Sequence, residues 1–169
     1  MLESDFEALV TANEALKPVQ LAVGETVSTD ACTFAVTSVE YLDEVYPQDT
    51  SGYYRYLPDE SDKTYVVAWI DFTNNGTEYG NPDPSTQAAF SIAGNSYEAD
   101  VYLYEGSILS RSFSLDPKEG ASLLVVSSVP DSVLGSGESK FVWKLPKAVN
   151  GLQNYFNENG DNVTYEMAF

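Results

Sequence analysis

From Pro18 to the C-terminus, apolar and polar side chains alternate along one segment after another. Successive side chains of an extended strand point to opposite faces, so this period of two is typical of strands with one buried face. Clusters of Gly, Pro, Asn and Asp separate the segments. The pattern predicts strands at residues 19–23, 32–41, 64–73, 87–92, 96–104, 121–129, 139–145 and 162–169. Leu109, Arg111, Phe113 and Leu115 also alternate and are an optional further strand.

These strands predict an all-β fold, because no helical crossover separates them and an antiparallel sandwich accommodates short strands joined by turns. In the segment 96–104, Tyr97, Ala99, Val101 and Leu103 form the core face, and the opposite face is expected to be solvated. Segment 64–73 is apolar on both faces and reads as a central strand, with Val66, Ile70 and Phe72 in the core. Phe141, Trp143 and Leu145 are expected to face inward as well. Gly94 and Asn95 are expected to take positive φ in a hairpin turn.

The first residues follow a different pattern. Ser4 and Glu7 have the spacing of a capping box, and the apolar residues that follow have helical spacing up to Pro18. We therefore expect a short helix at about residues 4–16. A chain of 169 residues has the usual size of one domain. The predicted organisation is an N-terminal helix and linker at 1–17 and a β-sandwich domain at 18–169.

Composition excludes several classes of function. The formal net charge is −18, and eight Lys and Arg residues cannot readily form the basic face that nucleic acid requires. The chain has no histidine, which excludes Ser-His-Asp and Cys-His catalysis and His-ligated zinc. Cys32 has no partner for an internal disulfide and shares strand parity with Phe34, so we expect a buried, inert thiol.

Four segments in order follow a known pattern: GETVS at 24–28, FAVTSVEY at 34–41, YVVAWIDFTNNG at 65–76 and LDPKEGASLLVVSSVP at 115–130. With them the sequence resembles the small immunoglobulin-like domains of exported lipoproteins and secreted antigens of Gram-positive bacteria, over residues 19–169. The resemblance implies an immunoglobulin-like β-sandwich of about seven to nine strands, export and tethering to the cell envelope by an N-terminal lipid. It implies no catalytic residues. The chain has neither a signal peptide nor a lipid-bearing cysteine at its start, so tethering would depend on a leader outside this sequence.

The long segment 42–63 carries aromatic side chains that an ordinary turn does not need. Loops of this length are usually functional or disordered, whereas strand connections usually have about 4 to 6 residues. Tyr53, Tyr54 and Tyr56 supply contact area at low entropic cost, and Arg55 can pair with a carboxylate or stack on a ring. These four residues are the predicted ligand-binding site. The alternative is that the rings fold back as a satellite cluster on the edge of the sandwich.

Acidic residues suggest two weaker hypotheses. Glu98 and Asp100 lie on one strand face, with carboxyl groups expected about 6 to 7 Å apart, as a glycan hydrolase could use them. Exposed acids on a strand are nevertheless routine. The acidic loops at 59–62 and 157–162 could offer oxygen ligands to calcium, but neither has the spacing of a calcium loop.

The sequence as a whole favours a non-enzymatic, exported binding or accessory domain of the cell envelope. A protein, a peptide or a glycan is the expected partner, and no cofactor or metal is expected. The alternatives are the hydrolase with Glu98 and Asp100, or a purely structural spacer. Contact with the membrane would occur only through a lipid anchor, and the oligomeric state is open.

Overall fold

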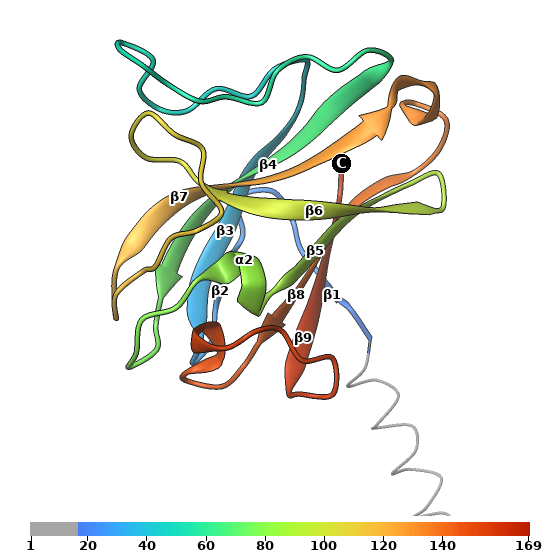
Figure 1. Ribbon diagram of the computed structural model, residues 1–169. Helices are drawn as coiled ribbons and strands as arrows, with labels where there is room; N and C mark the ends of the chain where they lie inside the picture. Colours follow the sequence, from blue (N-terminus) through green and yellow to red (C-terminus); the bar gives the residue numbers. More distant parts are fainter. Residues whose placement is uncertain (1–16) are drawn as a thin grey trace, which may run out of the picture.

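The protein is a curled, all-β sandwich in the computed structural model, which describes residues 17–169 (Figure 1). The strands are β1 (Val19–Gln20), β2 (Thr26–Ser28), β3 (Cys32–Leu42), β4 (Lys63–Asn74), β5 (Gln87–Ile92), β6 (Asn95–Leu103), β7 (Gly120–Pro130), β8 (Ser139–Pro146) and β9 (Asn162–Ala168). A four-residue helix, α2 (Pro82–Ser85), and two 3₁₀ turns, η1 (Asp131–Val133) and η2 (Gly151–Gln153), lie between strands. The expected helix at 4–16 lies outside the described residues.

The two layers of the sandwich are halves of one nine-stranded sheet with the order β1-β9-β8-β5-β6-β7-β4-β3-β2. Strand β6 belongs to both layers, because its first half pairs with β5 and its second half, from Asp100, pairs with β7. All pairs are antiparallel except β1 with β9. The sheet ends at β1 and β2, which are not hydrogen-bonded to each other, so the sandwich has an open seam between these two strands.

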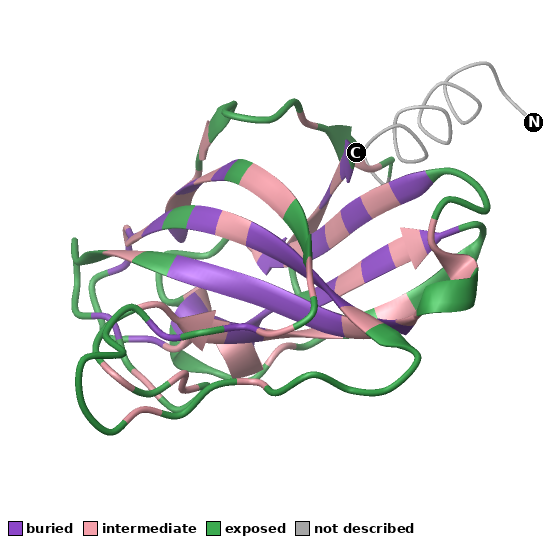
Figure 2. Ribbon diagram, turned by 90° about the horizontal axis from the view of Figure 1, so that it is seen from above, coloured by how far each residue is buried: buried purple, intermediate pink, exposed green. Residues whose placement is uncertain are grey.

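Alternation of side chains places one face of each layer in the main core, which Figure 2 shows as buried and less buried residues succeeding each other along the strands. The expected core residues Val66, Ile70 and Phe72 are at most 2% exposed. Trp143 is fully buried, and its indole N–H donates to Thr86 Oγ1 over 3.0 Å. The predictions for the core faces of segments 64–73 and 139–145 are therefore confirmed.

A second apolar cluster covers the outer face of β4 and β7. It contains Val45, Tyr65, Val67, Leu124 and Val126, and confirms that β4 is a central strand covered on both sides. The cluster also corrects one expectation, because Tyr102 and Tyr104 pack against it instead of standing in solvent. The outer face of β6 is thus exposed to solvent only along its first half, at Ser96 and Glu98.

The Asn-Asn-Gly segment at the end of β4 is a structural junction. Asn74 is 1% exposed and its side-chain amide donates to the carbonyl oxygens of Glu78 and Leu115, both at 3.0 Å. Its side-chain oxygen accepts from the backbone N–H of Gly76 at 2.9 Å. Its backbone pairs with the turn before β7, since Lys118 N donates to Asn74 O and Asn74 N donates to Glu119 O. Two segments that carry the sequence resemblance therefore hydrogen-bond to each other.

Seven predicted strands agree with the structure to within one residue at each end. The first is shorter than expected, since β1 has two residues, and β2 was not predicted. The optional strand at Leu109–Leu115 is wrong: this segment forms only isolated bridges, because Leu109 packs on the outer cluster while Leu115 enters the main core. In the β5–β6 turn the positive φ values belong to Ala93 and Gly94, since Asn95 already begins β6. None of the described helices is long and apolar enough to cross a membrane.

Candidate functional site

The segment between β3 and β4 is held in place by its own backbone. Val45 and Leu57 exchange two backbone hydrogen bonds, of 3.0 and 2.8 Å, which closes the intervening residues into a ribbon. Val45 is 1% exposed and anchors the ribbon in the outer apolar cluster. Backbone hydrogen bonds from Asp49 to Gly106 O and from Arg55 to Ser107 O, both 2.9 Å, attach the ribbon to the β6–β7 connection. The loop therefore has a defined position.

Three tyrosines of this loop form an aromatic cluster. The rings of Tyr46 and Tyr56 are stacked, with centroids 5.0 Å apart and 11° between planes. Tyr54 lies tilted against both, with centroid distances of 6.0 Å to Tyr46 and 5.8 Å to Tyr56. Tyr46 and Tyr56 are still 44% and 41% exposed, and Tyr54 is half-buried. The rings cover one another and belong to neither buried cluster.

Tyr53 and Arg55 project separately from this cluster. Tyr53 is 75% exposed, and its hydroxyl accepts a hydrogen bond of 3.2 Å from Arg55 Nε. The structure thus places the four predicted ligand-binding residues in two groups on the loop, Tyr53 with Arg55 and Tyr54 with Tyr56, and adds Tyr46 to the second group. We call Tyr46, Tyr53, Tyr54, Arg55 and Tyr56 the tyrosine surface.

The surroundings of the tyrosine surface are acidic. Residues 43–62 contain six carboxylates and one basic side chain, Arg55. The Glu44 carboxylate accepts the Tyr46 hydroxyl and raises the pKa of Tyr46 to about 12, because loss of the proton would remove this bond and place two negative charges together. Asp49 accepts hydrogen bonds from the Ser51 hydroxyl and backbone N–H, which lower the pKa of its carboxyl. The Ser51 contacts thus keep Asp49 ionised at neutral pH.

Glu98 and Asp100, the alternative catalytic pair, have different environments. Glu98 is exposed, whereas Asp100 forms an ion pair with Arg111 Nη2 at 3.1 Å. Arg111 also binds Asp83 of α2 at 3.2 Å, and Asp83 accepts from the backbone N–H of Val101. Burial raises the pKa of Asp100, and Arg111 opposes this effect. The Asp83–Arg111–Asp100 group fastens α2 to β6.

No group of three acidic or cysteine side chains that could hold a metal ion occurs within residues 17–169. The acidic loops at 59–62 and 157–162 are also otherwise engaged: Glu60 pairs with Lys63 and accepts from Ser128, and Asn157 and Asn162 bond within their own turn. Cys32 is fully buried, and burial raises its thiol pKa to about 12. The expectation of a buried thiol is confirmed.

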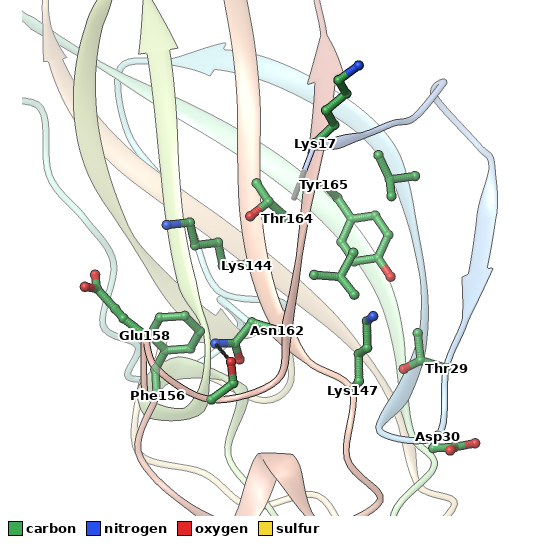
Figure 3. A pocket seen from close by; sticks show the side chains of 13 residues that line it. Lys17, Thr29, Asp30, Lys144, Lys147, Phe156, Glu158, Asn162, Thr164 and Tyr165 are labelled. Atoms are coloured by element: carbon green, nitrogen blue, oxygen red, sulfur yellow. Dashed lines mark hydrogen bonds between the residues drawn. The ribbon is translucent and has the colours of Figure 1, made fainter. Parts of the chain in front are cut away.

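A pocket of about 760 Å³ lies at the seam of the sandwich, next to β1 and β9, and sequence reasoning did not find it (Figure 3). Its walls come from Lys17 and β1, from the β2–β3 turn, from β8 with Lys147, and from β9 with the turn before it. Three lysines line it: Lys17, Lys144 and Lys147. Lys17 is far in sequence from Lys144 and Lys147, so no local motif reveals the three together. Neither Glu98 nor Asp100 is among the lining residues.

A curled antiparallel sandwich with an ordered, aromatic connecting loop defines the class of protein: a β-sandwich domain with exposed loop surface. The chain belongs to the family described as Domain of unknown function (DUF4352), whose model matches residues 21–120. No curated protein is similar to the chain.

Solved structures show the same fold. An uncharacterized β-sandwich protein from Clostridium difficile 630 superposes with a TM-score of 0.70 at 17% identity, covering 89% of this chain and 94% of the other. A conserved hypothetical protein from Bacillus anthracis gives a TM-score of 0.51 at 16% identity, over 72% and 88% of the two chains. A "putative lipoprotein" from Bacillus subtilis is more distant, with a TM-score of 0.48 at 11% identity, over 85% of this chain and 38% of the other.

Proposed function

We propose that this chain is a non-enzymatic binding domain of the cell envelope, exported and tethered by an N-terminal lipid, with the tyrosine surface as its contact site. The location is supported by the resemblance to exported lipoprotein domains. An immunoglobulin-like assignment of the sandwich belongs to the same proposal, supported by the antiparallel layers around the buried Trp143.

The exposure of the tyrosine surface is the observation that carries the proposal. Rings that only filled space would be covered by the sandwich, yet Tyr53 is 75% exposed on a loop whose backbone is hydrogen-bonded in place. Binding to such a loop costs little ordering entropy, and large, stiff aromatic side chains are the residues that dominate binding energy in interfaces. Binding residues of proteins are found most often on loops that a rigid scaffold holds in position.

The charge around the rings selects the class of ligand. Six carboxylates and one arginine in residues 43–62 attract cationic partners and repel anionic ones. A Lys or Arg side chain can also bind over the face of a tyrosine ring. The preferred partner is therefore a protein or peptide segment with basic side chains, and a neutral glycan stacked on the rings is the competing ligand.

A binding assay with variants of the loop tests this proposal. The probe is a fluorescein-labelled peptide of alternating Lys and Ala, with an uncharged Ser-Ala peptide and a chitohexaose as competing ligands. Replacing Tyr53, Tyr54 and Tyr56 together by serine should weaken binding of the basic peptide about tenfold or more, which corresponds to roughly 1.4 kcal/mol. Tyr155→Ser is the matched control, because Tyr155 is 84% exposed but belongs to a different surface.

The stability of the triple variant shows whether the three rings are exposed contact residues or part of the core. Its three lost ring pairs involve exposed or half-buried side chains, so the unfolding free energy should fall by no more than about 4.5 kcal/mol, at roughly 0.5 to 1.5 kcal/mol for a pair. A much larger loss would mean that the rings belong to the core. If the triple variant and Tyr155→Ser bind the basic peptide equally well, the contact site is refuted. If only the chitohexaose binds saturably, the ligand is a glycan and not a basic peptide.

A further inference from the structure

The pocket at the seam is far from the tyrosine surface. In Figure 1 the loop 43–62 lies at one end of the sandwich, and the lower ends of β1 and β9 lie at the other. The pocket exists because β1 pairs with β9 only at Tyr165 and Glu166, which leaves the edge of Asn162–Thr164 without a neighbouring strand. The β2–β3 turn, with Thr29 and Asp30, forms the opposite wall.

Tyr165 contributes a hydroxyl group to the lining of this pocket. Its residue is only 5% exposed, and its ring packs edge-on against Phe34 with centroids 5.1 Å apart. The residue lines the pocket, and its hydroxyl is not a buried atom left without a hydrogen-bond partner, since residues 17–169 contain none. Burial also raises the pKa of Tyr165, so the hydroxyl is a donor at neutral pH. A phenol hydroxyl at an open pocket can donate a hydrogen bond to an acceptor from outside the chain.

The second feature of the pocket is its charge. Three of the eight basic side chains of a chain with net charge −18 line it, against Asp30 and Glu158. In Figure 3 the Lys147 ammonium and the Tyr165 hydroxyl point into the same part of the pocket, on one side of β9. Lys144 and Glu158 lie on the other side of that strand. The pocket lining is therefore richer in basic side chains than the rest of the molecule.

Lys147 is available to an external ligand. Its ion pair with Asp161 is 3.9 Å long, and the two side chains are 51% and 76% exposed. Exposed pairs of this length contribute little stability, so an anion that approaches Lys147 more closely can replace Asp161. The Thr29 hydroxyl is less available, because it already donates to Cys32 O and accepts from the backbone N–H groups of Ala31 and Cys32.

We propose that the seam pocket binds the oxyanion group, carboxylate or phosphate, of a small anionic molecule. Lys147 supplies the positive charge and Tyr165 donates a hydrogen bond from its hydroxyl. Lys17 adds positive charge at the rim, and Asp30 and Glu158 limit the size and charge of the anion that fits. The volume of about 760 Å³ lies within the usual range for small-molecule sites, about 300 to 1,000 Å³.

Nuclear magnetic resonance on the full chain labelled with ¹³C-tyrosine tests the proposal. Inorganic phosphate and citrate are titrated separately, with sodium chloride at the same ionic strength as the reference. The Tyr165 ring signal, identified by its loss in Tyr165→Phe, should shift saturably with at least one of the two anions. Lys147→Gln should weaken the binding of that anion about tenfold.

Lys140→Gln is the matched control, since it removes the same charge from strand β8 without touching the pocket. Saturation by citrate alone supports a carboxylate ligand, and saturation by phosphate alone supports a phosphorylated one. The proposal is overturned if neither anion gives a saturable shift at Tyr165, or if Lys140→Gln weakens binding as much as Lys147→Gln. Shifts at Tyr53, Tyr54 and Tyr56 would instead concern the tyrosine surface, so the two proposals fail separately.

Discussion

Asn74 offers the sharpest test of how the junction between β4 and β7 is held. Its side chain is 1% exposed and takes part in three hydrogen bonds, to Glu78 O, Leu115 O and Gly76 N. Asn74→Ala removes all three and leaves the buried Gly76 N–H and Leu115 O without these partners. A lost hydrogen bond that leaves a buried group unpaired costs about 1 to 3 kcal/mol, so we expect a loss of about 3 kcal/mol.

Asn74→Asp probes the same contacts with a different charge. The carboxylate can still accept from Gly76 N–H, but it faces two carbonyl oxygens that the amide had bonded. The folded protein should therefore favour the protonated acid, so the pKa of this Asp is raised above its unfolded value of about 3.9. A group with a raised folded pKa contributes stability below the unfolded pKa and loses it as pH rises through the folded pKa. At pH 4 the free energy of unfolding of the Asp variant should thus equal or exceed that of Asn74→Ala. At pH 7 the Asp variant should be the less stable of the two.

Urea denaturation followed by tryptophan fluorescence measures these effects, because Trp143 is fully buried and reports on the core. A loss of about 3 kcal/mol lowers the melting temperature by roughly 6 to 12 °C in a domain of this size. Wild type at both pH values is the reference. A loss below about 1 kcal/mol for Asn74→Ala, or an Asp variant whose difference from wild type does not change with pH, would refute the role assigned to the amide.

Two further predictions follow from burial and close contacts. The Cys32 thiol, fully buried and with its pKa raised to about 12, should not react with a thiol reagent such as DTNB at pH 8 unless denaturant is present, and rapid labelling of the native protein would contradict its place in the core. A Cβ on Gly80 would lie 2.4 Å from Leu152 O, so Gly80→Ala should destabilise by about 2 kcal/mol in a thermal melt. Gly52→Ala, with nothing within 4 Å, should stay within about 0.5 kcal/mol, and equal melting of the two variants would contradict the crowding at Gly80.

Alternation along the chain was sufficient to predict the long strands and the direction of their side chains. Val66, Phe141 and Trp143 face inward as expected, because a one-residue change of register would move a whole apolar set into water. The short elements were less predictable. Strand β1 has two residues and helix α2 has four, which is too few for a period to emerge. Asn81 as a cap before Pro82 was nevertheless a usable local signal for α2.

The candidate surfaces were also only partly predictable from the sequence. A long loop rich in tyrosine was visible in the sequence, but stacking of Tyr46 on Tyr56 and exposure of Tyr53 depend on how the ribbon closes at Val45 and Leu57. The wet face expected for the second half of β6 became a covered one, because a loop distant in sequence lies over it.

The sequence by itself determined the class of fold and the main core, because these follow from local period. Only the tertiary structure decided that the two layers are one sheet with an open seam, and that Lys17, Lys147 and Tyr165 meet there. Strand order depends on contacts between residues far apart in the chain, and no local pattern records which edges come together.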